Sequence, residues 1–257
     1  MMKINRLTNQ SSNETLFETY VIEDYHSFET LLQAYHQFKQ QNSGKSILLT
    51  LDNLGQAEYT STHATLSHDL DDTEGYDLSN LDAAAFENGE HIGYLSTPSE
   101  FFIRKENFFK KAVDIAFADA CDRDLTIDTA EIDLLKKINQ NPITYFDQQV
   151  LVKIIPVTKS YEAICGFPNG YFASDLNPFE NYAVAKYLQQ QYGYELFGIG
   201  ASCIGFIRNA IPDNQVAKAL TLDIMKLYHA PESMFQQIAE VVSKQAHLIL
   251  KYVETIE

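Results

Sequence analysis

The chain has 257 residues, of which 45% are hydrophobic and 21% charged, so it can bury a sizeable core. Its many aromatic residues, 15 Tyr and 16 Phe, exclude general disorder. The net charge of −16 opposes binding to the phosphates of nucleic acids. No apolar run approaches the ~20 residues of a membrane span, and the N-terminus lacks the apolar core of a secretory signal. The three cysteines, Cys121, Cys165 and Cys203, are far apart and odd in number, which indicates buried, inert thiols in a reducing cytoplasm.

Residues 46–103 carry eleven acidic side chains and no Lys or Arg. Nothing else in the sequence has so strong a charge bias. An uncompensated negative surface repels nucleic acid and attracts basic proteins or cations. The segment is therefore the main sequence indication of a binding surface.

The first half of the chain begins with a helix over 27–41, where apolar residues recur at helical spacing behind the capping residue Ser27. A buried strand at 46–51 follows, and 56–60 is expected to pair with it across a turn. Residues 61–90 are predicted to form a long irregular acidic loop, with a possible strand at 91–95.

Thr97-Pro98-Ser99-Glu100 has the pattern of a helix start, and the following apolar face predicts a helix that ends near Cys121. Asp128-Thr129-Ala130-Glu131 repeats the capping pattern and predicts a helix that Asn141-Pro142 closes.

The second half alternates predicted strands and helices in chain order. Strands are expected at 150–157, 161–165, 194–199 and 203–208, the last two as a hairpin. Helices are expected from Asn177 to Gly193, from Pro212 to about Tyr228, and over 232–253.

These elements predict an α+β fold in which mixed or antiparallel sheets are flanked by about six helices. If the chain has two units, the best division is an N-terminal α+β unit over 1–145 with the acidic loop and a C-terminal α+β unit over 146–257. A single domain is the alternative at this length.

Several glycine motifs fail to match nucleotide or nucleophile sites. Gly44-Lys45-Ser46 lacks the upstream glycine of a phosphate loop, because position 39 is Lys. Gly198-Ile199-Gly200 lacks the third glycine and the helix of a dinucleotide fingerprint. Gly200-Ala201-Ser202-Cys203-Ile204 misses the closing glycine of a nucleophile elbow. These glycines are better explained by a tight hairpin and close backbone packing.

Two cation sites were weighed for the acidic loop. Asp69–Gly75 has the clustered oxygen donors that calcium prefers, but positions 74 and 80 do not match a calcium-binding EF-hand loop. The order His36, His68-Asp69, Asp133 resembles metal-dependent HD phosphohydrolases. That family places the His-Asp pair on a buried apolar helix, whereas the residues around His68 are polar and acidic.

One stretch resembles an uncharacterised bacterial domain family. It comprises Pro168-Asn169-Gly170-Tyr171-Phe172, Asp175–Phe179 and Tyr192–Gly200, within roughly the last 90 residues. The resemblance implies a bacterial, cytoplasmic α+β protein and assigns no functional residue. In composition, the chain also resembles acidic bacterial immunity proteins, which neutralise basic toxins.

The leading prediction is a non-enzymatic, acidic protein-binding protein of bacteria, with a toxin-neutralising immunity protein as its most concrete form. The predicted binding residues are Asp69, Asp71, Asp72, Glu74 and Asp77, and the expected partner is a basic protein. No catalytic residue, metal ligand or cofactor is assigned. The alternatives are a metal-dependent hydrolase that uses the His/Asp-rich loop and a structural or assembly protein.

Overall fold

The computed structural model describes residues 2–7 and 16–256, which form the predicted α+β fold. The main feature is a seven-stranded mixed sheet in the order β1-β2-β6-β3-β7-β8-β9. Its strands are β1 Lys3–Arg6, β2 Glu18–Glu23, β3 Ser46–Thr50, β6 Val150–Ile155, β7 Glu195–Ile199, β8 Cys203–Ile207 and β9 His247–Lys251. Strands β3 and β7 pair in parallel, and the other neighbouring strands of this sheet, within the described residues, pair antiparallel.

The sheet joins both halves of the chain. Strand β6, from the second half, lies between β2 and β3 from the first half, and β3 in turn pairs with β7. Residues on both sides of position 145 therefore alternate as neighbours in one sheet.

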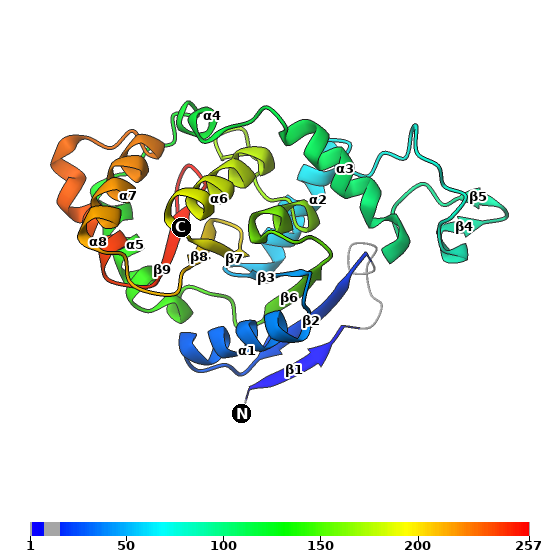
Figure 1. The fold of residues 1–257 in the computed structure, drawn as a ribbon, viewed down its shortest axis with the longest axis horizontal. Helices are drawn as coiled ribbons and strands as arrows, with labels where there is room; N and C mark the ends of the chain where they lie inside the picture. The colour runs from blue at the N-terminus through cyan, green and yellow to red at the C-terminus, as the bar shows by residue number, and fades with distance from the viewer. Residues whose placement is uncertain (1, 8–15, 257) are drawn as a thin grey trace.

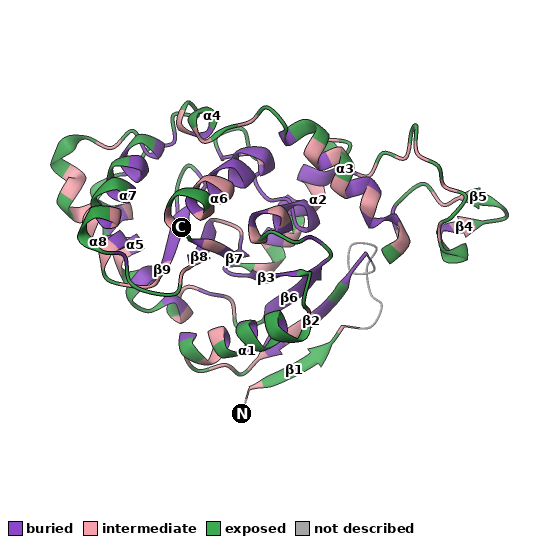
Figure 2. Ribbon diagram, in the orientation of Figure 1, coloured by how far each residue is buried: buried purple, intermediate pink, exposed green. Residues whose placement is uncertain are grey.

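Helices cover both faces of this sheet, with α1 below it and α2 and α6 above it in the view of Figure 1. The helices are α1 Phe28–Gln41, α2 Leu54–Ser67, α3 Phe101–Ala112, α4 Phe117–Cys121, α5 Thr129–Gln140, α6 Pro178–Tyr192, α7 Asn214–Leu227 and α8 Phe235–Ser243. Every residue of β3 and β6 is buried, as expected for central strands covered on both faces (Figure 2).

Helices with strong local caps lie where the sequence predicts them. The side chain of Ser27 accepts a hydrogen bond from Thr30 N–H at the start of α1. Asp128 and Glu131 form the capping box of α5, and Asn177 and Glu180 form that of α6. Caps act within a few residues, so the local sequence is enough to predict them.

The predicted strand at 56–60 is wrong, because these residues lie in α2. Asn53 adopts a left-handed conformation (φ 41°) and caps the helix by accepting from Gln56 N–H. The small residues Ala57, Ser61 and Ala64 then bury one helical face. The predicted loop over 61–90 is also wrong for residues 61–67, because α2 continues to Ser67. After Ser67 the chain forms turns and the two short strands β4 (Phe86–Glu87) and β5 (Glu90–His91).

Two further predictions are corrected by the structure. The expected strand at 161–165 is the 3-10 helix η5 (Ser160–Gly166), whose first turn is held by Glu162 Oε2 accepting from the N–H groups of Thr158 and Lys159. The helix from Thr97 ends at Ala112. A separate helix, α4, then begins where Asp119 accepts from Ala116 N–H.

The predicted C-terminal helix over 232–253 is replaced by α8 and the edge strand β9. Residues 247–251 pair with β8 along its whole length. On the free side of β9, Asn139 of α5 donates to Ile249 C=O and accepts from Ile249 N–H, at 2.9 and 2.8 Å. The Asn139 side chain thus satisfies backbone groups that an edge strand would otherwise expose.

Candidate functional site

The acidic loop over 68–82 is fastened to α3. Asn107 of α3 donates to the carbonyl groups of Leu70 and Asp72, at 3.1 and 2.8 Å. Its side-chain oxygen accepts from Tyr76 Oη–H at 2.7 Å. The loop is therefore held in one conformation by contacts of both its backbone and its side chains.

One of the five predicted binding residues has a structural role. Both carboxylate oxygens of Asp71 accept hydrogen bonds from Arg104 of α3, each at 2.6 Å. Arg104 is only 2% exposed. Asp71 is therefore the partner of a buried guanidinium, whose positive charge offsets its own.

The other four predicted residues, Asp69, Asp72, Glu74 and Asp77, are exposed. Among residues 2–7 and 16–256, no Lys or Arg forms an ion pair with any of them. Asp72 accepts from Glu74 N–H and Asp77 accepts from Ser79 N–H, at 2.9 and 3.0 Å. The hydrogen bonds from Ser79 lower the pKa of Asp77, so it is ionised at neutral pH.

The acidic segment has no Lys or Arg of its own, but in the folded protein cations of α3 lie close to it. Lys110 of α3 donates to Tyr76 Oη at 2.8 Å and lies over the Tyr76 ring. The pKa of His68 is lowered by burial and by the nearby charge of Lys111. Helix α3 thus places cations beside a segment that contains none itself.

The residues of the metal-dependent hydrolase alternative do not come together as a ligand set. His36 lies on α1, His68 follows α2 and packs edge-on against Phe179, and Asp133 of α5 pairs with Lys136. In the part of the chain that the structure describes, no three His, Cys, Asp or Glu side chains are arranged to hold a metal ion. The geometry gives this alternative no support.

A second candidate site is a cleft of about 610 Å³ beside the carboxyl ends of β3 and β7. Ligands of open α/β sheets commonly bind outside the carboxyl ends of parallel strands. The cleft is lined by the loop after β3, the β7–β8 turn, the segment before α6 and the C-terminal tail. Its lining residues are Asp52, Asn53, Gln56, Tyr145, Phe172, Ser174, Asp175, Ala201, Ser202, Val253, Glu254 and Thr255.

Asp52 anchors the β7–β8 turn at the base of this cleft. It is 4% exposed, and its carboxylate accepts from Ser202 Oγ–H, Ser202 N–H and Cys203 N–H, at 2.6, 2.8 and 3.1 Å. Burial raises the pKa of Asp52, and these hydrogen bonds act in the opposite direction. A Cβ at Gly200 would lie 2.0 Å from Asp52 Oδ1, so the turn requires glycine there.

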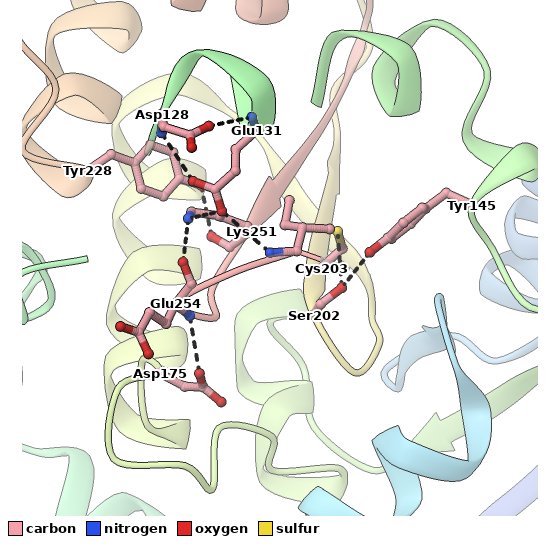
Figure 3. A network of polar contacts seen from close by, with 10 residues as sticks. Asp128, Glu131, Tyr145, Asp175, Ser202, Cys203, Tyr228, Lys251 and Glu254 are labelled. Carbon is pink, nitrogen blue, oxygen red and sulfur yellow. Dashed lines mark hydrogen bonds and ion pairs between the residues drawn. The ribbon is translucent and has the colours of Figure 1, made fainter. Parts of the chain in front are cut away.

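Ser202 Oγ donates to Asp52. It also lies 3.0 Å from Tyr145 Oη (Figure 3). No His or Lys lines the cleft within the described residues, so Ser202 has no basic partner of the kind found in hydrolase triads. This arrangement places two hydroxyl groups, those of Ser202 and Tyr145, beside the carboxylate of Asp52.

The C-terminal tail closes one side of the cleft. Buried Lys251 donates to Glu131 Oε1 and to Glu254 C=O, at 2.6 and 2.7 Å (Figure 3). Asp175 accepts from Glu254 N–H at 3.3 Å. Burial is the main reason that the pKa of Asp175 rises to about 6. These contacts fix the backbone of Glu254 beside Asp175, and both residues line the cleft.

No local sequence pattern predicts this cleft, although the Gly200-Ala201-Ser202-Cys203 turn at its base is recognisable in the sequence. The observable signals were the Asp52-Asn53 pair directly after a buried strand and the glycines of the hairpin. A Cβ at Gly198 or Gly205 would meet Leu51 or Phe197 within 3.0 Å, which agrees with the predicted close packing. Nothing local links these residues to Tyr145, Asp175 or Glu254.

No protein-family model, no curated protein and no solved structure matches this chain. Among the described residues, no helix has the length and apolar character needed to cross a membrane.

Proposed function

We propose that this chain is a non-enzymatic protein-binding protein whose acidic loop engages a basic partner protein. The observation that carries the proposal is a set of four exposed acids, without ion-pair partners in the described part of the chain, on a loop that contacts α3. Preformed charge complementarity accelerates association and selects partners of opposite charge. A toxin-neutralising bacterial immunity protein is the most concrete form, because a basic toxin would supply the complementary charge.

Because Asp71 is paired with Arg104, we leave it out of the proposed face. We expect the binding residues to be Asp69, Asp72, Glu74 and Asp77. At the border lie the exposed acids Asp82, at the end of the loop, and Glu87 and Glu90 of the adjoining segment. The segment that carries β4 and β5 projects from the body of the molecule (Figure 1). A projecting acidic element increases the surface that a partner can reach.

The test compares two variants with equal charge. The loop variant changes Asp69, Asp72 and Asp77 to Asn and Glu74 to Gln, which keeps the side-chain acceptors of the turns. The control variant makes the same change in charge at exposed acids elsewhere: Asp114, Asp122, Asp124 and Glu232. Each variant loses four negative charges from the total of −16.

Immobilised wild type, loop variant and control variant are compared in capture from lysates of the source organism, and association rates are measured at 0.05 and 0.3 M NaCl. We expect the wild type and the control variant to capture the same basic protein. The loop variant should associate at least tenfold more slowly, with a weaker salt dependence. Equal capture by all three proteins, or equal loss in both variants, would reject the loop as the binding face.

A further inference from the structure

The cleft at the carboxyl ends of β3 and β7 has an unbalanced charge. Three carboxylate residues, Asp52, Asp175 and Glu254, line it, and no Lys, Arg or His among the described residues does so. The other polar lining groups are neutral hydroxyl and amide groups. A bound cation would therefore find acceptors and no competing positive side chain in the wall.

Two of these carboxylates have capacity for a ligand. The carboxylate of Asp52 already accepts three hydrogen bonds from the β7–β8 turn. Asp175 accepts from Glu254 N–H through Oδ1 at 3.3 Å, and a hydrogen bond with the backbone of Phe172 also favours its ionised form. Glu254 is exposed, and its carboxylate has no ion-pair partner in the same part of the chain. The guanidinium of Arg123 donates to Asp175 C=O and pairs with Glu180, and its charge acts to lower the pKa of Asp175.

An exposed aromatic row continues from the mouth of the cleft. Phe172 lines the cleft and is 47% exposed; the Tyr171 ring lies 5.4 Å from it, the His63 ring 5.1 Å from Tyr171, and the Tyr59 ring 4.0 Å from His63. Tyr171 and Tyr59 are 39% and 49% exposed. Aromatic faces attract ammonium and guanidinium groups, and exposed aromatic clusters are typical of recognition surfaces.

The cleft is also formed in advance of any ligand. Asp52 fixes the β7–β8 turn, and the tail is held by the buried Lys251–Glu131 pair, whose side chains are 0% and 14% exposed. Its volume, about 610 Å³, falls within the range of small-molecule sites.

We propose that this cleft binds a protonated amine or guanidinium group, held by Asp175 and Glu254 and covered by Phe172. Ser202 and Tyr145 supply hydroxyl groups for the rest of the ligand. The proposal goes beyond the protein-binding function and is independent of it, because none of its residues belongs to the acidic loop.

The test is isothermal titration calorimetry of the full chain at pH 7.5 and low salt, with agmatine and spermidine as probes and glutamate as the anionic comparison. We expect both cationic probes to bind and glutamate not to bind. Asp175→Asn should weaken binding at least tenfold and Phe172→Ala several-fold. Asp114→Asn, at an exposed acid outside the cleft, should change affinity less than twofold.

A capped Gly-Arg-Gly peptide distinguishes the sources of the cationic group. Tighter binding of the peptide than of agmatine would assign the cleft to an arginine side chain of another protein, and the reverse would assign it to a free small molecule. Glu254→Gln, at an exposed position, provides a second variant if Asp175→Asn is poorly folded. No binding of any cationic probe up to millimolar concentration, or equal weakening by Asp114→Asn, would overturn the proposal.

Discussion

At the scale of single residues, Asp175 shows how burial sets the chemistry of the cleft. It is 5% exposed, and its pKa of about 6 lies above the ordinary value of 3.8. The folded protein therefore holds this proton more tightly than the unfolded chain does. Above pH 6 the buried carboxylate is ionised, and its lost hydration lowers the stability of the fold.

The raised pKa of Asp175 gives a pH-dependent prediction for the stability of Asp175→Asn. The contribution of Asp175 to stability falls as pH rises from about 4 through 6, because the unfolded chain binds fewer protons than the native state in this window. We expect the variant to be more stable than the wild type at pH 7.5, by about 1 kcal/mol, and equally stable at pH 4. Asn retains the acceptor for Glu254 N–H.

Urea denaturation at the two pH values measures this difference, with Asp114→Asn as the exposed control. Because other groups titrate alike in both proteins, the change with pH isolates Asp175. A variant that is less stable than the wild type at pH 7.5 would show that attraction to Arg123 outweighs the cost of burial.

At the scale of elements, the contact between α5 and β9 depends on a buried ion pair. Lys251 of β9 is fully buried, and Glu131 near the start of α5 is its partner at 2.6 Å. The same glutamate forms the capping box of α5 through Oε2, which accepts from Asp128 N–H at 3.1 Å. One side chain thus joins the helix start, the edge strand and the tail.

Removing only Lys251 should lower the free energy of unfolding more than removing both charges of the Lys251–Glu131 pair. We expect Lys251→Met to lower the free energy of unfolding by about 3 kcal/mol, because Glu131 is left as a largely buried, unpaired charge. The double variant Lys251→Met with Glu131→Gln should recover at least half of this loss, since Gln keeps the cap. Urea denaturation of the single and double variants measures both free energies of unfolding. A double variant as unstable as the single one would contradict the prediction.

At the scale of the whole molecule, the net charge of −16 makes long-range repulsion part of the stability. The Debye length falls from about 10 Å at 0.1 M salt to about 3 Å at 1 M. We expect Tm to rise with NaCl between 0.02 and 0.5 M. This increase of Tm with NaCl should be smaller than in the wild type, and by the same amount, in the loop variant and in its charge-matched control. The two variants should behave alike because the cations of α3 lie beside the loop and offset part of its charge. A much smaller rise in the loop variant alone would show that repulsion is concentrated there.

Several features of this protein were determined by the sequence itself. The α+β class follows from the periodicity of its apolar residues, and α1, α5 and α6 follow from Ser27, Asp128 and Asn177 with their neighbours. The hairpin of β7 and β8 was predicted from its glycines. Caps, turns and amphipathic faces depend on residues a few positions apart, so a single sequence contains all the information that they need.

Tertiary structure decided the elements whose local signals are ambiguous. Residues 247–251 extend a helical pattern in sequence but form a strand, because β8 offers a free edge and Asn139 covers the other side. Residues 56–60 form a helix because both neighbours of β3 are other strands, β6 and β7. Short apolar segments take the structure that their distant partners satisfy.

The same distinction applies to the candidate sites. The acidic loop was visible in sequence because its acids are clustered within a few positions. Only the fold showed that Asp71 pairs with Arg104 and that α3 lies alongside the loop. The cleft was invisible, because Asp52, Tyr145, Asp175 and Glu254 are separated by tens of residues. Charge and caps are properties of the local chain, whereas a cavity exists only where distant segments meet in space.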